Sequence, residues 1–309
     1  KKFKKNKKEK VFIGLITLFF GWFFMNLYFS DLFFDKKEVV VEISNEKIDY
    51  FSNLDLKSKA VFVWDMREKE VLFEKNSEAQ LPLASLTKLM TGWIASEIVP
   101  KGTLVAIDQN DMMEEGDQGL LVGEKWTLGN MIDFTLVTSS NDGARALTSL
   151  AGYGQFLKEQ EERKIFIDKM NSEAKKIGLT QTFFLSESGL DLSESLSGSY
   201  GSAKDTAFLI EYILEQKPFL LEATTYPDII LNSSHLKHEV INTNKIISEI
   251  PGVLASKTGF TDLAGGNLVT VFDAGINHPV VVVVLGSGIN ERFEDIEKLV
   301  WSSILSISS

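Results

Sequence analysis

The sequence predicts an α/β protein of the α+β type, in which an antiparallel sheet is flanked by helices and joined to a helical lobe. Three observations predict this fold class. Strand-like runs occur near both ends of the folded part, patterns typical of helices fill its middle, and an amphipathic helix closes the chain. Strands from both ends most simply form one antiparallel sheet, with the helical block inserted between them.

The strands are predicted from short runs rich in β-branched and aromatic residues. The runs at 60–64 and 70–74 flank a charged turn, which indicates a β-hairpin. Near the end of the chain, the runs at 267–272 and 279–285 are separated by the turn-rich segment 273–278. These four runs supply the predicted sheet.

The helices are predicted from apolar residues that recur at three- to four-residue spacing. In the middle of the chain this pattern covers 85–98, 127–138, 142–152, 162–177 and 202–215. A last helix is predicted at 292–307, because Ile296, Leu299, Val300 and Ile304 lie on one face.

Charge is distributed unevenly along the chain. The net charge is −11, but residues 1–10 contain seven Lys and one Glu. The remaining chain therefore has 25 basic and 42 acidic residues. An acidic body would repel a phosphate backbone, so the composition argues against nucleic acid as a partner.

The basic run precedes a stretch of 19 residues, Val11–Phe29, that carries no formal charge. A helix of this length spans roughly 28 Å, about the hydrocarbon thickness of a bilayer. The preceding lysines predict that the N-terminus stays in the cytoplasm and that the rest is exported. A cleaved signal peptide is disfavoured, because bulky residues at 27–34 stand where a small-residue cleavage site would be.

Four successive parts are therefore predicted. They are a cytoplasmic basic tail at 1–10, a single-pass transmembrane anchor in the lipid bilayer at 11–29, a tether at 30–57 and one folded domain at 58–309. Within the tether, the run 38–43 favours a short strand.

The composition also limits the chemistry. Without cysteine, the chain has neither a disulfide framework nor a thiolate nucleophile. Its three histidines, His235, His238 and His278, lack the spacing of metal ligands and are interpreted as surface or loop residues. A Ser-His-Asp triad would have to recruit one of them. We expect no metal site and no cofactor.

Three short motifs occur in one order and together indicate acyl transfer by a serine. They are Ser85-Leu86-Thr87-Lys88, Ser139-Ser140-Asn141 and Lys257-Thr258-Gly259. Such an enzyme needs a hydroxyl nucleophile, an amine that takes its proton, and polar groups that relay the proton and hold a carboxylate. Ser-x-x-Lys alone is not specific, because it begins at Ser44, Ser85, Ser172 and Ser234. The order and context of all three motifs carry the interpretation.

The first motif offers the nucleophile and its base. Ser85 begins a predicted helix, and Lys88 follows at i+3 on the same face, which brings its amine near the Ser85 hydroxyl. The helix N-terminus would supply backbone N–H groups and a positive dipole end to an oxyanion. To act as base, Lys88 needs a lowered pKa, which partial burial and the charge of Lys257 would provide. The competing interpretation is an N-cap serine followed by a solvent-exposed lysine.

The second motif lies between two predicted helices, where polar side chains can point into a cleft. Ser139 and Asn141 are two residues apart, so an extended or turn-like backbone places both on one side. The Ser139 hydroxyl would relay a proton, and the Asn141 amide would bind the substrate backbone. The competing interpretation is another helix cap, with Ser140 or Asn141 as N-cap.

The third motif is predicted on an edge strand, 254–261, that lines the same cleft. There Lys257 offers a positive charge and Thr258 a hydroxyl, and both suit a substrate carboxylate. Gly259 leaves room for a ligand backbone beside the strand. Phe260 would contribute its backbone N–H as the second oxyanion donor. The competing interpretation is an ordinary Lys-Thr-Gly turn.

From about residue 59 to 301 the chain resembles the low-molecular-weight penicillin-binding proteins, the serine-type D-Ala-D-Ala carboxypeptidases of peptidase family S11. The likeness extends beyond the three motifs. It is carried by 83–91, 139–144, 184–190, 200–205, 257–261 with Ala264 and Gly265, and Val284–Gly286 with Arg292. The chain departs from the family pattern where Leu83 replaces a usual Pro and where Gly201 and Ser202 replace common Ser and Thr.

The resemblance implies a serine β-lactamase/transpeptidase-like domain and a mechanism. Ser85 would attack the carbonyl between two D-alanines, Lys88 would be the base, and Ser139 would assist proton transfer to the leaving D-alanine. The implied substrate-binding residues are Asn141, Lys257, Thr258, Gly259 and Phe260. The implied substrate is a peptidoglycan stem peptide that ends in D-Ala-D-Ala, with β-lactams as covalent inhibitors. The implied location is a bacterial cell membrane, with the catalytic domain outside the cytoplasm.

Three other functions remain open. A D,D-endopeptidase on peptidoglycan cross-links shares the chemistry and differs in the shape of its cleft. A class A-like β-lactamase would need a carboxylate for deacylation, but Glu173 and Glu187 lack the expected context, and Ser140 stands where Asp is expected. A membrane-tethered sensor would capture muropeptides or β-lactams with slow turnover.

Overall fold

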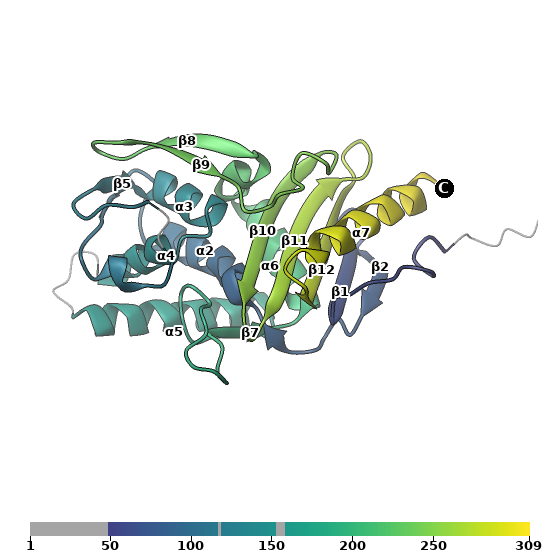
Figure 1. Cartoon of the computed structure of the whole chain (residues 1–309), viewed down its shortest axis with the longest axis horizontal. Coiled ribbons are helices and arrows are strands. Elements are labelled where there is room, and N and C mark those ends of the chain that lie inside the picture. The colour runs from purple at the N-terminus through teal and green to yellow at the C-terminus, as the bar shows by residue number, and fades with distance from the viewer. Residues whose placement is uncertain (1–48, 117–118, 153–157) are drawn as a thin grey trace, which may run out of the picture. The chain divides into compact units, whose positions relative to one another are not determined.

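A five-stranded antiparallel sheet forms one side of the structure, a computed structural model that describes residues 49–116, 119–152 and 158–309 (Figure 1). Its strand order is β10-β11-β12-β1-β2. The bounds are Ala60–Asp65 for β1, Glu70–Lys75 for β2, Val253–Thr261 for β10, Gly265–Asp273 for β11 and Pro279–Ser287 for β12. Strand β1 pairs with β12, Ala60 lying opposite Leu285. The sheet predicted from both ends of the chain is confirmed, with both of its hairpins.

The β1–β2 turn follows from local polar chemistry. The Asp65 carboxylate accepts hydrogen bonds from the backbone N–H groups of Arg67 and Glu68 at 2.9 and 3.0 Å. An aspartate that bonds the backbone two residues on in this way reverses the chain without a glycine. Lys69 then adopts a positive φ of 54° before β2 begins.

Strand β12 shows why the sheet has two cores. Every residue from Val280 to Leu285 is buried, and successive side chains point to opposite faces. The odd-numbered residues join the core beneath the helical lobe, and the even-numbered ones join the core beneath α7 (Glu291–Ser308). Helix α7 confirms the predicted terminal helix, and Figure 1 shows it lying across β11 and β12.

The helical block between β2 and β10 also matches the prediction. Its helices are Lys88–Ile98 for α2, Leu128–Val137 for α3, Asn141–Thr148 for α4, Glu159–Ile177 for α5 and Ala203–Gln216 for α6. Helix α6 packs on β1 and β12, and the others form a lobe beside β10 (Figure 1). Two predicted helices are shorter than expected, because Ala84–Thr87 and Ser149–Gly152 form 3₁₀ turns, named η1 and η3.

Several short elements have no counterpart in the sequence prediction. The strands are Leu81–Pro82 for β3, Leu104–Ala106 for β4, Lys125–Thr127 for β5, Phe183–Phe184 for β6, Ser199–Gly201 for β7, Asp228–Asn232 for β8 and Lys237–Ile241 for β9. The 3₁₀ turns are Asp111–Met113 for η2, Pro218–Leu220 for η4 and Glu222–Thr225 for η5. Elements of two or three residues are too short to show a period, so pattern reading passes over them.

The domain extends upstream of β1. Phe51 is only 6% exposed, and its ring stacks on Phe73 with centroids 5.3 Å apart. Residues upstream of 58, the predicted start of the folded domain, therefore also pack in its core. The predicted tail, anchor and 38–43 strand fall outside the described residues. Within the described ranges, no helix is long and apolar enough to cross a membrane.

Candidate active site

The Ser85 hydroxyl and the Lys88 amine meet at the junction of η1 and α2. Lys88 Nζ lies 2.8 Å from Ser85 Oγ. It also donates to Asn141 Oδ1 at 2.7 Å and to the Ser188 carbonyl at 2.8 Å. The first two motifs are therefore in direct contact through one amine.

The turn that carries Ser85 differs from the prediction. Ser85 lies in the 3₁₀ turn η1, and the α-helix begins only at Lys88. Ala84 holds a positive φ of 49°, a strained conformation for a residue with a Cβ. The Thr87 hydroxyl donates to the Ala84 carbonyl at 2.6 Å and braces this turn. Ser85 therefore lies on a tight turn before the α-helix rather than in the first turn of that helix.

Burial determines the pKa of Lys88. Its side chain is fully buried, and desolvation lowers the pKa of its amine to about 7. The negative charges of Glu187 and Glu114 act in the opposite direction. Burial, and not the expected charge of Lys257, is the cause that lowers this pKa. Near neutral pH a substantial fraction of Lys88 is therefore neutral and able to accept a proton.

The second motif divides its roles between neighbouring residues. Ser140 is the N-cap of α4, because its hydroxyl accepts the Gly143 N–H at 2.9 Å. Ser139 adopts a positive φ of 63° between α3 and α4. The Asn141 amide nitrogen donates to the Glu115 carbonyl at 2.6 Å, which leaves its oxygen toward Lys88. Ser140 thus caps the helix, whereas its neighbours Ser139 and Asn141 contact the two lysines.

The third motif supplies the second buried amine of the site, that of Lys257, which contacts Ser139. Lys257 Nζ donates to Ser139 Oγ at 2.8 Å and to the Thr258 carbonyl at 2.8 Å. Burial, followed by the charges of Lys88 and Arg292, holds the pKa of Lys257 well below its ordinary value. The Thr258 hydroxyl donates to Thr243 Oγ1 at 2.6 Å.

Strand β10 packs tightly against the Ser85 turn. A Cβ on Gly259 would lie 3.0 Å from the Leu83 carbonyl oxygen and 3.1 Å from the Ser85 nitrogen. The buried Arg292 guanidinium, from α7, donates to the Gly259 carbonyl at 2.6 Å. Strand β10 is an edge strand, as predicted, and the Phe260 side chain on it is 45% exposed. The role of the Ser85 and Phe260 N–H groups as oxyanion donors stays a prediction.

Some contacts at this site are not predicted by the three motifs. Thr243 belongs to no motif and reaches Thr258 from a loop. The Ser188 contact uses a backbone carbonyl, which any residue would supply. Glu187, the residue beside it, is fully buried, and its carboxylate accepts from Arg163 Nε at 2.9 Å. A buried carboxylate with an arginine partner is visible only in three dimensions.

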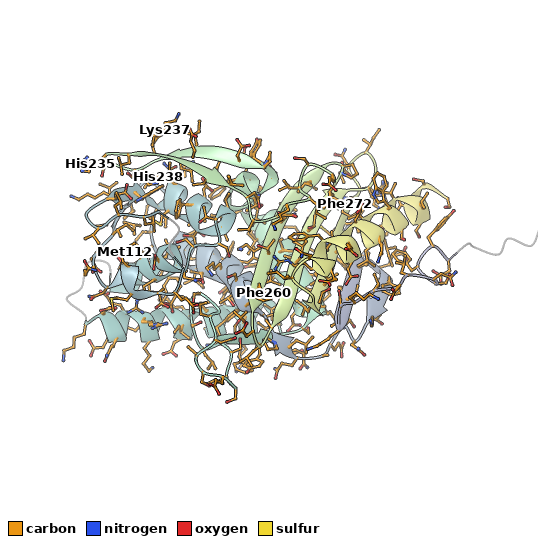
Figure 2. The ribbon with its side chains drawn as sticks, viewed as in Figure 1. Met112, His235, Lys237, His238, Phe260 and Phe272 are labelled. Carbon is orange, nitrogen blue, oxygen red and sulfur yellow. The ribbon has the colours of Figure 1, made fainter. Side chains whose placement is uncertain are left out.

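The histidines lie elsewhere. His238 Nε2 is 2.9 Å from Glu124, and His278 Nε2 is 2.7 Å from Asp65. Figure 2 shows His235 and His238 on the β8–β9 hairpin, away from Phe260 of β10. In the described part of the chain, Ser85 has no histidine partner, and no group of three or more His, Asp or Glu side chains is arranged to hold a metal ion.

A family model described as D-alanyl-D-alanine carboxypeptidase matches residues 47–288. The chain therefore belongs to this family of serine peptidases, and the resemblance predicted from its motifs is confirmed. The matched range contains η1, the α3–α4 junction and β10, the three places that form the candidate site.

Relatives and solved structures agree with this assignment. D-alanyl-D-alanine carboxypeptidase DacF of Bacillus subtilis is 30% identical over 80% of this chain. The match spans 62% of DacF, so the chain covers about three fifths of that relative. A D-alanyl-D-alanine endopeptidase of Pseudomonas aeruginosa is 28% identical over 79% of the chain and 76% of its own length.

Among solved structures, penicillin-binding protein D2 of Listeria monocytogenes in its ampicillin-bound form is 27% identical, with a TM-score of 0.66 over 81% of this chain and 98% of its own. The Streptomyces K15 DD-transpeptidase, at 21% identity and a TM-score of 0.73, covers 83% of this chain with all of its own and shows the shared fold. The predicted transpeptidase-like domain is therefore confirmed.

Proposed function

We propose that this protein is a membrane-anchored serine D-Ala-D-Ala carboxypeptidase. It removes the terminal D-alanine from peptidoglycan stem peptides through an acyl-enzyme on Ser85. The observation that carries the proposal is the pair of 2.8 Å contacts, Lys88 to Ser85 and Lys257 to Ser139. These contacts support the proposal, in which Ser85 is the nucleophile, Lys88 with its lowered pKa is the base and Ser139 relays a proton.

In the acylation step, neutral Lys88 accepts the proton of the Ser85 hydroxyl. Ser85 Oγ then forms a bond to the carbonyl carbon of the penultimate D-alanine, and the carbonyl oxygen becomes an oxyanion. The backbone N–H groups of Ser85 and Phe260 stabilise this oxyanion. As the C–N bond breaks, the leaving amine receives a proton through the Ser139 hydroxyl, which lies 2.8 Å from Lys257 Nζ.

In the deacylation step, water attacks the ester on Ser85 and returns a proton to the serine. Before acylation, Asn141 orients the peptide, and Lys257 with Thr258 binds the terminal carboxylate, which then leaves with the released D-alanine. A β-lactam ring presents an amide carbonyl and a carboxylate in a similar arrangement, so penicillins acylate Ser85 as substrate mimics. No step needs a metal or a cofactor.

The location follows from the sequence pattern. Residues 11–29 are uncharged and follow seven lysines, so they anchor the chain in a bacterial cell membrane with the N-terminus in the cytoplasm. The substrate is a cell-wall peptide, and the catalytic domain therefore faces outward. An alkaline-carbonate extraction and protease protection of the full chain in bacterial cells test both statements.

The first test of the chemistry uses the full chain in detergent, with a fluorescent penicillin and a peptide that ends in D-Ala-D-Ala. We expect covalent labelling and release of D-alanine, and both are lost in Ser85→Ala. The matched control is Ser172→Ala, which removes the serine of another Ser-x-x-Lys sequence, exposed on α5. Labelling that survives in Ser85→Ala but is lost in Ser172→Ala would assign the nucleophile elsewhere.

The second candidate function is D,D-endopeptidase activity. The similarity to the Pseudomonas endopeptidase, at 28% identity, supports this second candidate. A cross-linked muropeptide dimer and a D-Ala-D-Ala pentapeptide, supplied at equal concentration, separate the two activities. Faster cleavage of the dimer would assign the endopeptidase. Rapid hydrolysis of penicillin would indicate a β-lactamase, and labelling without turnover of either peptide would indicate a sensor.

A further inference from the structure

A second pocket lies on the helical lobe, apart from the candidate active site. Its volume is about 520 Å³, within the range of small-molecule sites. Its walls come from α3, η4, η5, the end of α2 and the loop that follows α2. The apolar part of the lining includes Ile132, Phe219 and Leu220. None of the three sequence motifs contributes a residue to it.

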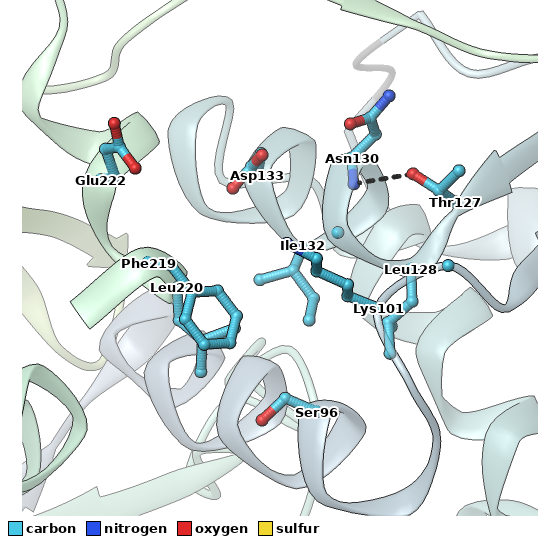
Figure 3. A pocket seen from close by; sticks show the side chains of 12 residues that line it. Ser96, Lys101, Thr127, Leu128, Asn130, Ile132, Asp133, Phe219, Leu220 and Glu222 are labelled. Atoms are coloured by element: carbon cyan, nitrogen blue, oxygen red, sulfur yellow. Dashed lines mark hydrogen bonds between the residues drawn. The ribbon is translucent and has the colours of Figure 1, made fainter. Parts of the chain in front are cut away.

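The two carboxylates of this pocket, those of Asp133 and Glu222, have no hydrogen-bond or ion-pair partner among the described residues. Figure 3 shows the two along the same edge of the pocket, with Ile132, Phe219 and Leu220 beside them. The Lys101 amine lies 5.8 Å from the Phe219 ring centroid and forms no ion pair with either carboxylate.

The electrostatics of Asp133 reflect this arrangement. Burial, together with the charge of Glu222, raises the pKa of its carboxyl to about 7. Asp133 loses solvation and is also repelled by the charge of the exposed Glu222, and a cation bound beside both carboxylates would relieve this repulsion. The open aromatic ring of Phe219, 48% exposed, offers a flat apolar surface beside them.

We propose that this pocket binds an organic ammonium compound, a primary amine attached to an apolar group of about the size of a benzene ring. The ammonium lies between Asp133 and Glu222 and gives both carboxylates a partner. The apolar group covers Ile132, Phe219 and Leu220. Nothing in the proposed carboxypeptidase reaction uses this pocket.

The pocket is connected to the active site through two of its walls. Asp133 lies on α3, which ends two residues before Ser139. Glu222 lies on η5, where Thr224 Oγ1 accepts the Ser256 N–H at 3.1 Å and the Thr224 carbonyl accepts the Ser256 hydroxyl at 3.2 Å. Ser256 directly precedes Lys257. An occupant that joins Asp133 to Glu222 therefore changes how firmly Ser139 and Lys257 are held together.

The test is a ligand-observed NMR titration of the full chain with phenethylamine, beside phenethyl alcohol as an uncharged analogue of the same shape. We expect a dissociation constant for the amine in the millimolar range, about what a ligand of this size reaches, and binding of the alcohol at least about tenfold weaker. Asp133→Asn and Glu222→Gln should each weaken amine binding. Glu249→Gln, which changes an exposed carboxylate outside the pocket, should not.

Raising the pH adds a second measurement that does not depend on a variant. Above pH 7 Asp133 loses its proton while phenethylamine stays protonated, so amine binding should be tighter at pH 8 than at pH 6. The other charged groups of the pocket are Glu222 and Lys101. Equal binding of amine and alcohol, or amine binding that is indifferent to both substitutions and to pH, would overturn the proposal.

The connection to the active site has its own readout, which rests on the proposed function. At saturating phenethylamine, the rate of Ser85 labelling by a fluorescent penicillin should change at least about twofold in the wild type and stay constant in Asp133→Asn. An unchanged rate with proven binding would overturn the connection. A chain that binds the amine but is never labelled would instead count against the carboxypeptidase proposal.

Discussion

Lys88 is fully buried, which is unusual for a lysine, and the hydrogen-bond partners of its amine explain how the burial is tolerated. Its amine is bonded to a hydroxyl, an amide oxygen and a backbone carbonyl, all of them neutral. Neutral acceptors satisfy the amine without stabilising its charge as strongly as a carboxylate would. The distant Glu187 and Glu114 restore only part of what burial removes, so the pKa settles near 7.

The first prediction concerns pH. Below pH 7 Lys88 is protonated and cannot accept the Ser85 proton, so the second-order rate of penicillin acylation should rise as the pH increases through about 7. Lys88→Arg should slow acylation at least about 100-fold, because a guanidinium cannot act as base near neutral pH. Stopped-flow acylation between pH 5 and 9 measures both.

The control for this prediction is Lys175→Arg, the exposed lysine of the Ser172-x-x-Lys175 sequence on α5. It should leave the rate and its pH profile unchanged. A rate that is flat from pH 5 to 9 in the wild type would rule out Lys88 as the base.

The second prediction concerns Gly259. A methyl group there would press on the Leu83 carbonyl and the Ser85 nitrogen, at 3.0 and 3.1 Å, and would shift the turn that carries the nucleophile. Gly259→Ala should therefore lower the acylation rate at least about tenfold, since small displacements of reacting groups are costly. Gly275→Ala, whose new methyl meets only His278 at 3.8 Å, should be neutral. If Gly259→Ala is acylated at the wild-type rate, β10 and the turn can accommodate the added methyl group without displacing Ser85.

At the residue scale, the structure brings side chains of all three motifs together, but the motifs do not predict the hydrogen bonds between them. The Ser-Ser-Asn pattern fits a helix cap and a catalytic pair equally well, and the structure uses Ser140 for the first and its neighbours for the site. Of the two causes predicted to lower the pKa of Lys88, burial is the one that acts, and the charge of Lys257 is not among the causes. The burial is complete where the sequence predicts it as partial, because residues from several elements enclose the amine.

At the element scale, helix α7 contacts the candidate site through strand β10. Arg292 lies in the first turn of α7 and bonds the carbonyl of Gly259, on the strand that carries Lys257 and Thr258. Burial lowers the pKa of Arg292 only to about 10, so the guanidinium keeps its charge at neutral pH. A charged donor to a buried carbonyl fixes the position of that stretch of β10.

The third prediction follows from this contact. Arg292→Ala should lower the free energy of unfolding by about 1–3 kcal/mol, the usual cost of leaving a buried carbonyl without its charged donor. It should also slow acylation, because β10 becomes less firmly placed. Lys298→Ala removes a half-buried cation of the same helix whose hydrogen bond to the Asp55 carbonyl is exposed to solvent, and should cost less than about 0.5 kcal/mol. Urea unfolding and acylation rates measure these effects, and equal losses in the two variants would contradict the role of Arg292.

The elements themselves were predictable in proportion to their length. The long strands β11 and β12 and the helices α5 to α7 show clear periods and were placed within a few residues. The 3₁₀ turn at Ala84–Thr87 was not, because a helical pattern over 85–98 does not distinguish i+3 from i+4 bonding in its first turn. The β8–β9 hairpin was missed because its second strand, Lys-His-Glu-Val-Ile, is mostly polar.

At the scale of the whole molecule, the segment before β1 belongs to the core on the α7 side of the sheet. Phe51 packs there with Phe73 and is nearly inaccessible to solvent. The chain around it is charged and mixed, so composition alone marked it as tether. One buried aromatic residue among polar neighbours is a weak signal, and only its distant partner shows that it is folded.

The fourth prediction tests this boundary. Phe51→Ala should lower the free energy of unfolding by about 2–4 kcal/mol, since it removes a buried aromatic side chain and leaves a cavity. Asn53→Ala, at an exposed position in the same segment, should change it by less than about 0.5 kcal/mol. Denaturant midpoints of the two variants measure the difference. A change below about 0.5 kcal/mol for Phe51→Ala is within the range expected at the surface. It would show that this segment is part of the tether and not of the folded core.

The pairing of β1 with β12 also orders events in time. Synthesis begins at the N-terminus, so a nascent chain that stops before Val253 already holds Ser85, Lys88 and Ser139 but lacks Lys257 and the strands that close the sheet. Contacts between such distant segments form slowly. The candidate site can therefore be completed only after nearly the whole domain has been made, although Ser85 is among the first parts of the domain to appear.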